Sequence, residues 1–213
     1  MMLRRRGLMT KSFGDIPFGY KRCKFLKKSG TAYIDTGIIP DKSMDYDVVF
    51  DIEMTYPGTC YVFGSDSSYN IGFNLGCDFN NQEGIRSCKF STSTYYKTNI
   101  QLNIGVQYSV QICENKLAVK NKEFSEEFSE ISGSYVCAYS LILFGTNRNG
   151  KAMVNDTYCR NIRIYSFTIS KDGNKIMNLI PTLDRNGTPC MYDTVSKQTF
   201  YNAGEGSFLY ELA

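Results

Sequence analysis

Apolar and polar side chains alternate over much of the chain with the period of two that is typical of a half-buried β-strand. The longest such stretch is residues 44–54, where apolar side chains fill every second position and mostly acidic ones lie between them. Residues 106–112 and 162–169 alternate in the same way. A short apolar run at residues 139–144 is suited to a strand buried on both faces. Each stretch therefore predicts a strand.

Tight-turn signals lie between these stretches. Asn149-Gly150, Asp172-Gly173 and Asn186-Gly187 are dipeptides whose residues tolerate the positive φ that hairpin turns require. The second lies between residues 162–169 and the apolar residues 176–180, which predicts a hairpin.

Many short strands with frequent turns predict an all-β fold, and we expect an antiparallel two-sheet β-sandwich (jelly roll) with an extended N-terminal arm. Helical signals are weak. Phe124, Phe128 and Ile131 have helix-like spacing with glutamates between them, which predicts one short helix or turn there.

The composition fits a single folded domain and limits its chemistry. The chain has 213 residues, of which 42% are hydrophobic and 14% aromatic, but it contains no His and no Trp. Without His it cannot form a Ser-His or Cys-His nucleophile pair or a His-ligated metal centre. Without Trp it lacks the strongest stacking side chain, so Tyr would have to take that role.

Charge is distributed unevenly along the chain. Residues 1–28 contain nine basic side chains and one acidic one, whereas residues 29–213 contain 15 basic and 20 acidic ones. We therefore divide the chain into a basic arm at residues 1–22 and a β-sandwich domain at residues 23–213.

The arm allows three interpretations: a nucleic-acid contact, a solubilising tail, or a docking arm that orders on a partner. Its aromatic residues before Tyr20 are few and no nucleic-acid-binding motif is present, so we do not expect nucleic acid as a partner. We favour docking, through the residues Arg4, Arg5, Arg6, Lys11, Phe13 and Phe18.

The spacing of the cysteines and the hydropathy of the chain indicate in which compartment the protein is made. The eight cysteines are widely and irregularly spaced, so we expect buried reduced thiols rather than disulfides. No apolar segment follows Arg4–Arg6 as a signal peptide requires, and no run approaches the roughly 18 apolar residues of a membrane-spanning helix. We expect synthesis in the cytoplasm of a host cell and no membrane partner.

The acidic side of residues 44–54 resembles a catalytic arrangement. Residues two apart on one strand face lie about 7 Å apart, close to the separation of the paired carboxylates in glycoside hydrolases. Asp51 and Glu53 would form that pair. Simple alternation of a solvated outer face with an apolar inner face also explains the pattern, and we favour it. We therefore do not expect an enzyme.

Two polar segments are candidates for binding. Tyr69, Asn74 and Asp78 lie in a loop-rich region whose oxygens would suit sugar hydroxyls or Ca²⁺, although ordinary turn chemistry explains them as well. Arg148 lies in a polar loop at residues 145–150, which a hairpin connection also explains. We take Tyr69, Asn74, Asp78 and Arg148 as glycan-binding candidates and expect no metal and no cofactor.

Both ends of the domain are similar to a known family. Residues 27–37 (KKSGTAYIDTG) resemble the first strand of concanavalin A-like (laminin G-like) jelly-roll domains of gut bacteria and their phages. Residues 163–167, 178–181 and 200–208, with Met191-Tyr192-Asp193 before the last, are similar to that family's closing segment. The resemblance covers about residues 23–213.

The resemblance implies two antiparallel sheets whose terminal strands lie near each other. It also implies a surface or virion protein, such as a capsid decoration, head fibre or tail fibre, that adheres to glycans. The chain lacks the metal-site His of legume lectins and the acid motif of glucanases. We therefore expect a non-enzymatic structural or adhesion protein of a phage virion.

Its expected partners are other virion proteins, held by the arm, further copies of itself in a homo-oligomer, and a surface glycan. The alternative is a free carbohydrate-binding, lectin-like module. A third hypothesis is a glycoside hydrolase that acts through Asp51 and Glu53.

Overall fold

The fold was examined in a computed structural model, which describes residues 16–53, 59–68, 71–78, 84–90, 95–96, 102–113, 116–121, 125–129, 137–154 and 161–213. Every regular element in these residues is a β-strand, which confirms the predicted all-β class. None of these residues forms a helix long and apolar enough to cross a membrane.

The strands are β1 (Lys21–Gly30), β2 (Ile34–Asp35), β3 (Met44–Ile52), β4 (Thr59–Ser68), β5 (Ile71–Asp78), β6 (Gly84–Phe90), β7 (Tyr95–Tyr96), β8 (Tyr108–Cys113), β9 (Lys116–Lys120), β10 (Ser125–Ser129), β11 (Ile142–Leu143), β12 (Thr146–Arg148), β13 (Lys151–Met153), β14 (Ile162–Lys171), β15 (Asn174–Leu183), β16 (Pro189–Asp193), β17 (Thr199–Phe200) and β18 (Gly206–Leu212).

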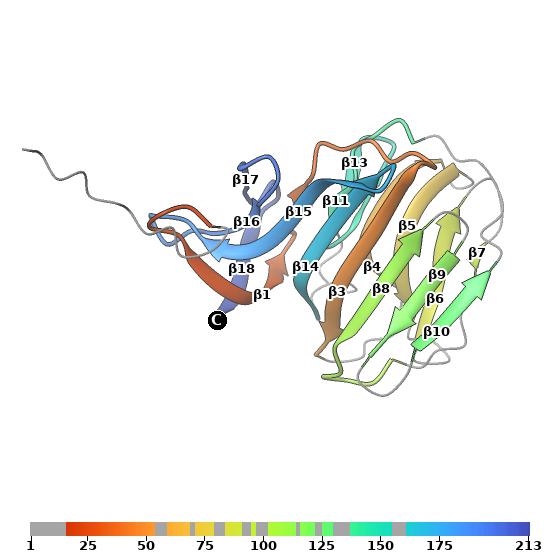
Figure 1. Cartoon of the computed structure of the whole chain (residues 1–213), viewed down its shortest axis with the longest axis horizontal. Coiled ribbons are helices and arrows are strands. Elements are labelled where there is room, and N and C mark those ends of the chain that lie inside the picture. Colours follow the sequence, from red (N-terminus) through yellow and green to blue (C-terminus); the bar gives the residue numbers. More distant parts are fainter. Residues whose placement is uncertain are drawn as a thin grey trace, which may run out of the picture.

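These strands form two sheets, which confirms the predicted two-sheet sandwich (Figure 1). The larger sheet has the order β10-β9-β8-β3-β14-β1-β15-β16-β17, and β18 also pairs with β1. The smaller sheet has the order β13-β12-β4-β5-β6-β7, and β11 joins β4 to β2. Neighbouring strands are antiparallel except for β12 and β4, which run parallel.

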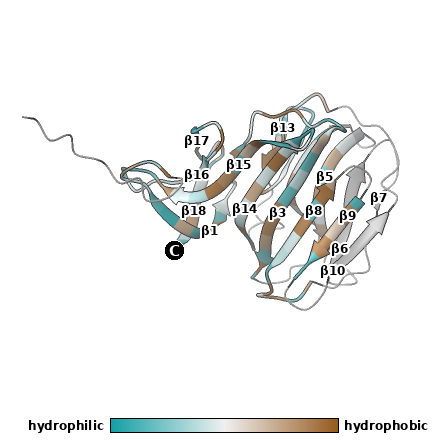
Figure 2. Ribbon diagram, viewed as in Figure 1, coloured by the Kyte–Doolittle hydropathy of each residue, from teal (hydrophilic) through white to brown (hydrophobic). Residues whose placement is uncertain are grey.

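Hydrophobic and hydrophilic residues alternate along strands such as β3 (Figure 2). One side of each sheet is therefore apolar, and the two apolar sides form the core. Tyr46 on β3 contacts Phe73 on β5 across the core, with ring centroids 4.3 Å apart. Phe167 on β14 packs edge-on against Phe63 on β4 at 5.3 Å. These aromatic rings are almost completely buried and hold the two sheets together.

The predicted turn dipeptides close hairpins. Asn149 (φ 52°) and Gly150 (φ 78°) connect β12 to β13, and Asp172 (φ 51°) and Gly173 (φ 75°) connect β14 to β15. A positive φ at both central residues is the signature of a type I′ turn, whose twist matches that of the flanking strands. The hairpin interpretation of residues 145–150 is therefore correct.

The β1 strand connects the sandwich to a projecting part of the molecule. It pairs with β14 through Leu26 and Lys27, with β15 through Lys21 and Arg22, and with β18 over most of its length. The terminal strands thus lie side by side, as expected. In Figure 1, β16, β17 and β18 project to the left of the sandwich together with the start of β1. We call residues 16–25 and 181–213 the wing.

The start of β1 also bears on the division of the chain. Since β1 begins at Lys21, the boundary expected between residues 22 and 23 falls within this strand. Of the residues expected to dock, Phe18 lies in the wing and is 74% exposed. The others, Arg4, Arg5, Arg6, Lys11 and Phe13, lie outside the described residues.

Two local predictions were wrong or incomplete. The short helix or turn expected at residues 124–131 is wrong, because residues 125–129 form β10 and pair with β9. Backbone pairing with an available sheet edge overrides the helix-like spacing there. In the run at residues 139–144, strand structure is confined to β11, although residues 141–147 are all buried.

The aromatic core gives a stability prediction. Phe167→Ala should lower the free energy of unfolding by about 3–5 kcal/mol, because it leaves a cavity between the sheets. The matched control is Phe18→Ala, which should change it by less than about 0.5 kcal/mol because Phe18 is exposed. Urea unfolding followed by fluorescence measures both. Equal effects of the two substitutions would contradict this account of the core.

Candidate functional site

The outer face of the larger sheet carries the polar half of the β3 alternation. Asp45, Asp47, Val49 and Asp51 point away from the core, while the residues between them are buried in it. The neighbouring strands β8 and β14 run antiparallel to β3 on either side. The acidic series therefore lies on the outer face, as the alternation predicts.

A β-bulge in β14 lies at Tyr165, which shares this face with Arg163. Ile164 pairs with Phe50 and Ser166 pairs with Val49, so Tyr165 is an extra residue opposite β3. Such an extra residue bends the strand locally and redirects a side chain. Sequence analysis did not single out Tyr165. The available signal is the apolar spacing in residues 162–169, which increases from two to three between Ile164 and Phe167.

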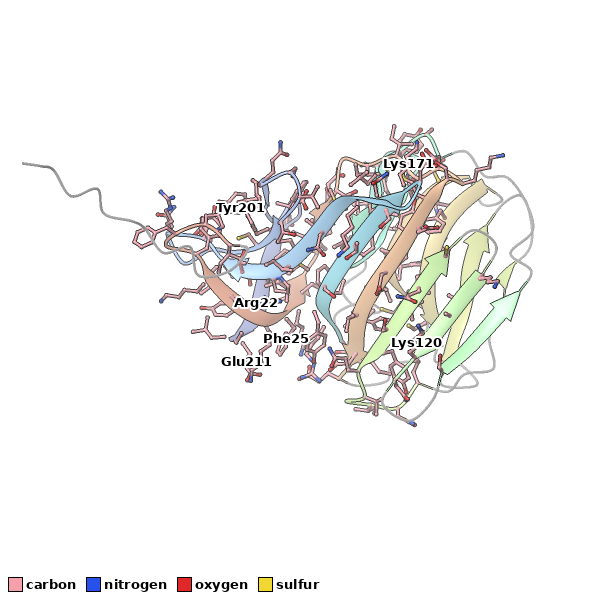
Figure 3. All side chains as sticks on the ribbon, viewed as in Figure 1. Arg22, Phe25, Lys120, Lys171, Tyr201 and Glu211 are labelled. Carbon is pink, nitrogen blue, oxygen red and sulfur yellow. The ribbon has the colours of Figure 1, made fainter. Side chains whose placement is uncertain are left out.

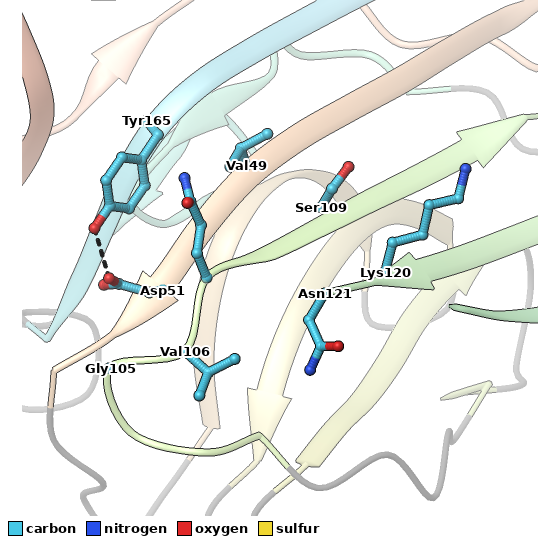
Figure 4. A pocket seen from close by; sticks show the side chains of 9 residues that line it. Val49, Asp51, Gly105, Val106, Ser109, Lys120, Asn121 and Tyr165 are labelled. Atoms are coloured by element: carbon cyan, nitrogen blue, oxygen red, sulfur yellow. Dashed lines mark hydrogen bonds between the residues drawn. The ribbon is translucent and has the colours of Figure 1, made fainter. Parts of the chain in front are cut away.

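Tyr165 and Arg163 bind the carboxylate of Asp51, and Figure 4 shows the bond from Tyr165. The Arg163 Nε and the Tyr165 hydroxyl each donate a hydrogen bond of 2.6 Å to Asp51, one to each carboxylate oxygen. The Asp51 side chain is only 3% exposed. Burial, followed by the bond to Asp51, raises the pKa of Tyr165, so this phenol stays protonated and donates.

Phe25 on β1 extends this group. Its ring lies 5.2 Å from the Arg163 guanidinium and 5.7 Å from the Tyr165 ring, which it meets edge-on. The hydrogen bond that Arg163 donates to Asp51 also raises the pKa of Arg163, which remains charged. Asp51 is thus neutralised by a buried ion pair that fixes the position of Tyr165.

A second polar network lies farther along β3. Gln111 on β8 donates from Nε2 to Asp47 at 2.8 Å, and Lys120 on β9 donates from Nζ to the Gln111 side-chain oxygen at 3.2 Å. Ser109 lies between the two networks, beside Val49. Its hydroxyl is 3.4 Å from Asp47.

Between the two networks lies a groove of about 560 Å³ (Figure 4). Its lining comprises Val49, Asp51, Gly105, Val106, Gln107, Ser109, Lys120, Asn121 and Tyr165. A smaller hollow of about 320 Å³ follows along the same strands, beside Asp47 and Gln111. Hydroxyl, amide and ammonium groups thus surround an apolar valine patch and one aromatic ring, an arrangement suited to a ligand rich in hydroxyl groups.

Glu53, the other member of the possible carboxylate pair with Asp51, directly follows β3. It is exposed, and its carboxylate forms an ion pair with Lys27 on β1. The hydrogen bond from Lys27 lowers the pKa of Glu53. A glycoside hydrolase needs one carboxyl group that stays protonated as a general acid, which requires a raised pKa.

The glycan-binding candidates from the sequence lie elsewhere. Asn74 is on β5 and pairs with Gly64 of β4, while Arg148 on β12 pairs with Asp66 of β4 and lies 3.4 Å from its carboxylate. The structure thus brings Asn74 and Arg148 to one face of the smaller sheet, on strands rather than in loops. Asn74 is 1% exposed, which leaves little surface for a sugar.

For the remaining two glycan-binding candidates, the structure describes only the backbone of Asp78. Asp78 is the last residue of β5, and Tyr69 lies outside the described residues. Among the residues that the structure describes, no group of three or more Cys, Asp or Glu side chains is arranged to hold a metal ion. Of the cysteines described with their side chains, five are buried free thiols and Cys113 is exposed.

The Asp51 ion pair gives a second prediction. Arg163→Met should destabilise the fold by about 3 kcal/mol, because it leaves a buried carboxylate without its cation; the partly exposed guanidinium keeps the value at the low end. The double substitution Asp51→Leu with Arg163→Met should restore most of that loss. Thermal and urea unfolding of the wild type and both variants measure the effect. A double variant as unstable as the single one would contradict the assignment.

Comparison with known proteins gives distant structural matches. No protein-family model and no curated protein matches the chain. Full-length tailspike protein 2 of an Escherichia coli O157:H7 bacteriophage is 11% identical, with a TM-score of 0.46 over 69% of this chain and 22% of that one. The enzymatically active domain of bacteriophage CBA120 tailspike protein 2 is 10% identical, with a TM-score of 0.45 over 68% of this chain and 25% of that one. The chain thus spans a quarter or less of these proteins, and at these TM-scores the likeness supports no transfer of activity.

Proposed function

We propose that the chain is a non-enzymatic adhesion module of a phage particle that binds a glycan in the groove on the outer face of its larger sheet. The observation that carries this proposal is the groove itself, which combines hydrogen-bonding side chains with a small apolar floor. Five of its nine lining residues lie on β3, β8, β9 and β14, and the other four directly precede β8 or follow β9, so the sheet positions most of the site.

The groove chemistry matches a sugar better than an apolar ligand. Gln107, Ser109 and Asn121 offer both donors and acceptors, as a ring of hydroxyl groups requires. Val49 and Val106 supply the apolar surface for the C–H face of a sugar ring. Tyr165 supplies the aromatic ring, in place of the Trp that the chain lacks.

The shape favours an oligosaccharide over a single sugar. The smaller hollow continues the groove along β3 and β8, past Asp47 and Gln111. A linear glycan lying across both would contact Ser109 and then Gln111, which are two residues apart on one strand face. Neighbouring weak contacts then add up to a useful affinity.

Binding without catalysis is supported by the state of the two carboxylates. The Asp51 carboxylate accepts hydrogen bonds from Arg163 and Tyr165, and the Glu53 carboxylate forms an ion pair with Lys27. Neither is placed as a protonated acid beside a free carboxylate.

The position on a particle follows from the arm and the sequence resemblance. The basic residues at the N-terminus would dock on other virion proteins. The jelly-roll body, of concanavalin A-like type and in several copies, would then project outward.

The groove is tested by filling it. Ser109→Phe places a ring in the groove and leaves the core unchanged, since Ser109 lies on the outer face. Binding to the best ligand from a glycan array should weaken at least about tenfold, a loss of about 1.4 kcal/mol. The matched control is Ser207→Phe on exposed β18, which should bind like the wild type.

The outcomes separate the hypotheses. A blank array would overturn glycan binding, and equal binding by the two Phe variants would overturn the groove as its site. Release of sugar products that stops in Asp51→Asn and Glu53→Gln variants would establish the hydrolase instead.

Cryo-microscopy of purified particles tests whether the N-terminal arm docks on other virion proteins. Residues 1–15 should contact another chain of the particle. Absence of the protein from particles would favour a free carbohydrate-binding module.

A further inference from the structure

The wing contains a second pocket, of about 340 Å³, on the far side of β1 from the groove. It is lined by Pro17, Tyr20, Asp184, Arg185, Asn186, Tyr192, Lys197, Thr199 and Tyr201. Figure 3 shows Tyr201 on the wing and Lys120 of the groove at the opposite side of the molecule. Its lining residues come from two turns, β16, β17, Tyr201 directly after β17, and the segment that precedes β1.

Asp184 builds one wall of this wing pocket. Its carboxylate accepts hydrogen bonds from the backbone N–H groups of Asn186 and Thr188, both at 2.8 Å, and from the Tyr201 hydroxyl at 3.0 Å. The hydrogen bond from Thr188 is the main cause that lowers the pKa of Asp184, and burial is the main cause that raises the pKa of Tyr201. At neutral pH the phenol therefore donates and the carboxylate accepts.

Aromatic rings form the adjoining wall. The rings of Tyr20 and Tyr192 lie 5.7 Å apart, and the Tyr20 hydroxyl is 3.0 Å from Thr199 Oγ1. Tyr201 is 46% exposed even though its hydroxyl is held by Asp184. An exposed ring in a fixed position is suited to stack on the face of a ligand.

Two cations complete the wing pocket. The Arg185 side chain lies against Gly19, and its Nε donates to the Phe18 carbonyl at 3.1 Å. Lys197 has a φ of 63°, in the left-handed region that residues with a side chain seldom adopt. Within the described part of the chain, neither Arg185 nor Lys197 forms an ion pair with a carboxylate.

We propose that the wing pocket binds an acidic sugar, with its carboxylate between Arg185 and Lys197 and its ring against Tyr201. The carboxylate of Asp184 already accepts three hydrogen bonds and pairs with neither cation. An anionic ligand would therefore bind between Arg185 and Lys197. The hydroxyl groups of Thr199 and Tyr20 and the amide of Asn186 would bind the sugar hydroxyls. A simple inorganic anion would use the cations but not the tyrosine wall.

This site extends the proposed function, because it names one class of sugar and places it outside the groove. Its occupancy does not depend on the groove. A negative result at one site therefore leaves the other untouched, and the two failures can be told apart.

The test compares D-glucuronate with D-glucose, which differ by one carboxylate, using NMR titration of the full chain. Glucuronate should shift the resonances of Tyr201 and Lys197 and bind at least about tenfold more tightly than glucose. Raising the salt concentration should weaken its binding, since the ion pairs are screened.

The informative variant is Lys197→Asn, because Asn adopts a positive φ readily and the turn should fold unchanged. It should bind glucuronate at least about tenfold more weakly, with an unchanged or higher urea midpoint. Lys151→Asn on exposed β13 removes a charge elsewhere and should bind like the wild type.

Three results would overturn the proposal: no glucuronate binding at millimolar concentration, phosphate binding as tightly as glucuronate, or binding that Lys197→Asn leaves intact. Loss of glucuronate binding in Ser109→Phe would also overturn it, since it would assign the sugar to the groove.

Discussion

The antiparallel pairing of β3 with β14 is the constraint on which the rest of the structure depends. The pairing runs from Ile52 and Ile162 to Met44 and Lys171, and it fixes which side chains face inward. Inward, it sets Tyr46 and Phe167 against the rings of the smaller sheet. Outward, it sets Asp51 beside Arg163. Because side chains on a strand have a period of two, a slip of one residue would exchange the core with the groove.

The bulge at Tyr165 shows how this pairing shapes the groove on the outer face. A regular strand would keep strict alternation and place fewer polar side chains beside β3. Tyr165 supplies a ring at the edge of the groove, and its hydroxyl donates to Asp51. The Asp51–Arg163 ion pair and the bond from Tyr165 thereby fix the position of this ring beside the groove.

The strand pairs of β1 extend the same sheet into the wing. One face of β1 continues the sandwich core through Leu26, while its first residues pair with the end of β15. The final strand, β18, lies along β1, and the last backbone N–H, of Ala213, donates to the Arg22 carbonyl. The groove and the wing pocket thus occupy separate parts of one continuous sheet.

Local pattern predicted the class of fold but not the sites. Strict alternation at residues 44–54 and the Asn-Gly and Asp-Gly dipeptides were sufficient for β3 and two hairpins, because they depend on neighbours in the sequence. Residues 125–129 were misassigned, since their strand exists through pairing with β9. Gln107, Ser109, Lys120 and Tyr165 meet only after β8, β9 and β14 are placed beside β3, and no short motif marks them. Asn74 resembled a loop residue because the pairing of β4 with β5 is a long-range property.

The most direct test of the account is a crystal structure of the chain with the oligosaccharide that binds best on an array. The account predicts a sugar ring over Val49 and beside Tyr165, with hydroxyl groups in contact with Ser109 or Gln107 and with the Asp51–Arg163 pair unchanged. A glycan bound to the smaller sheet, with the groove empty, would contradict it.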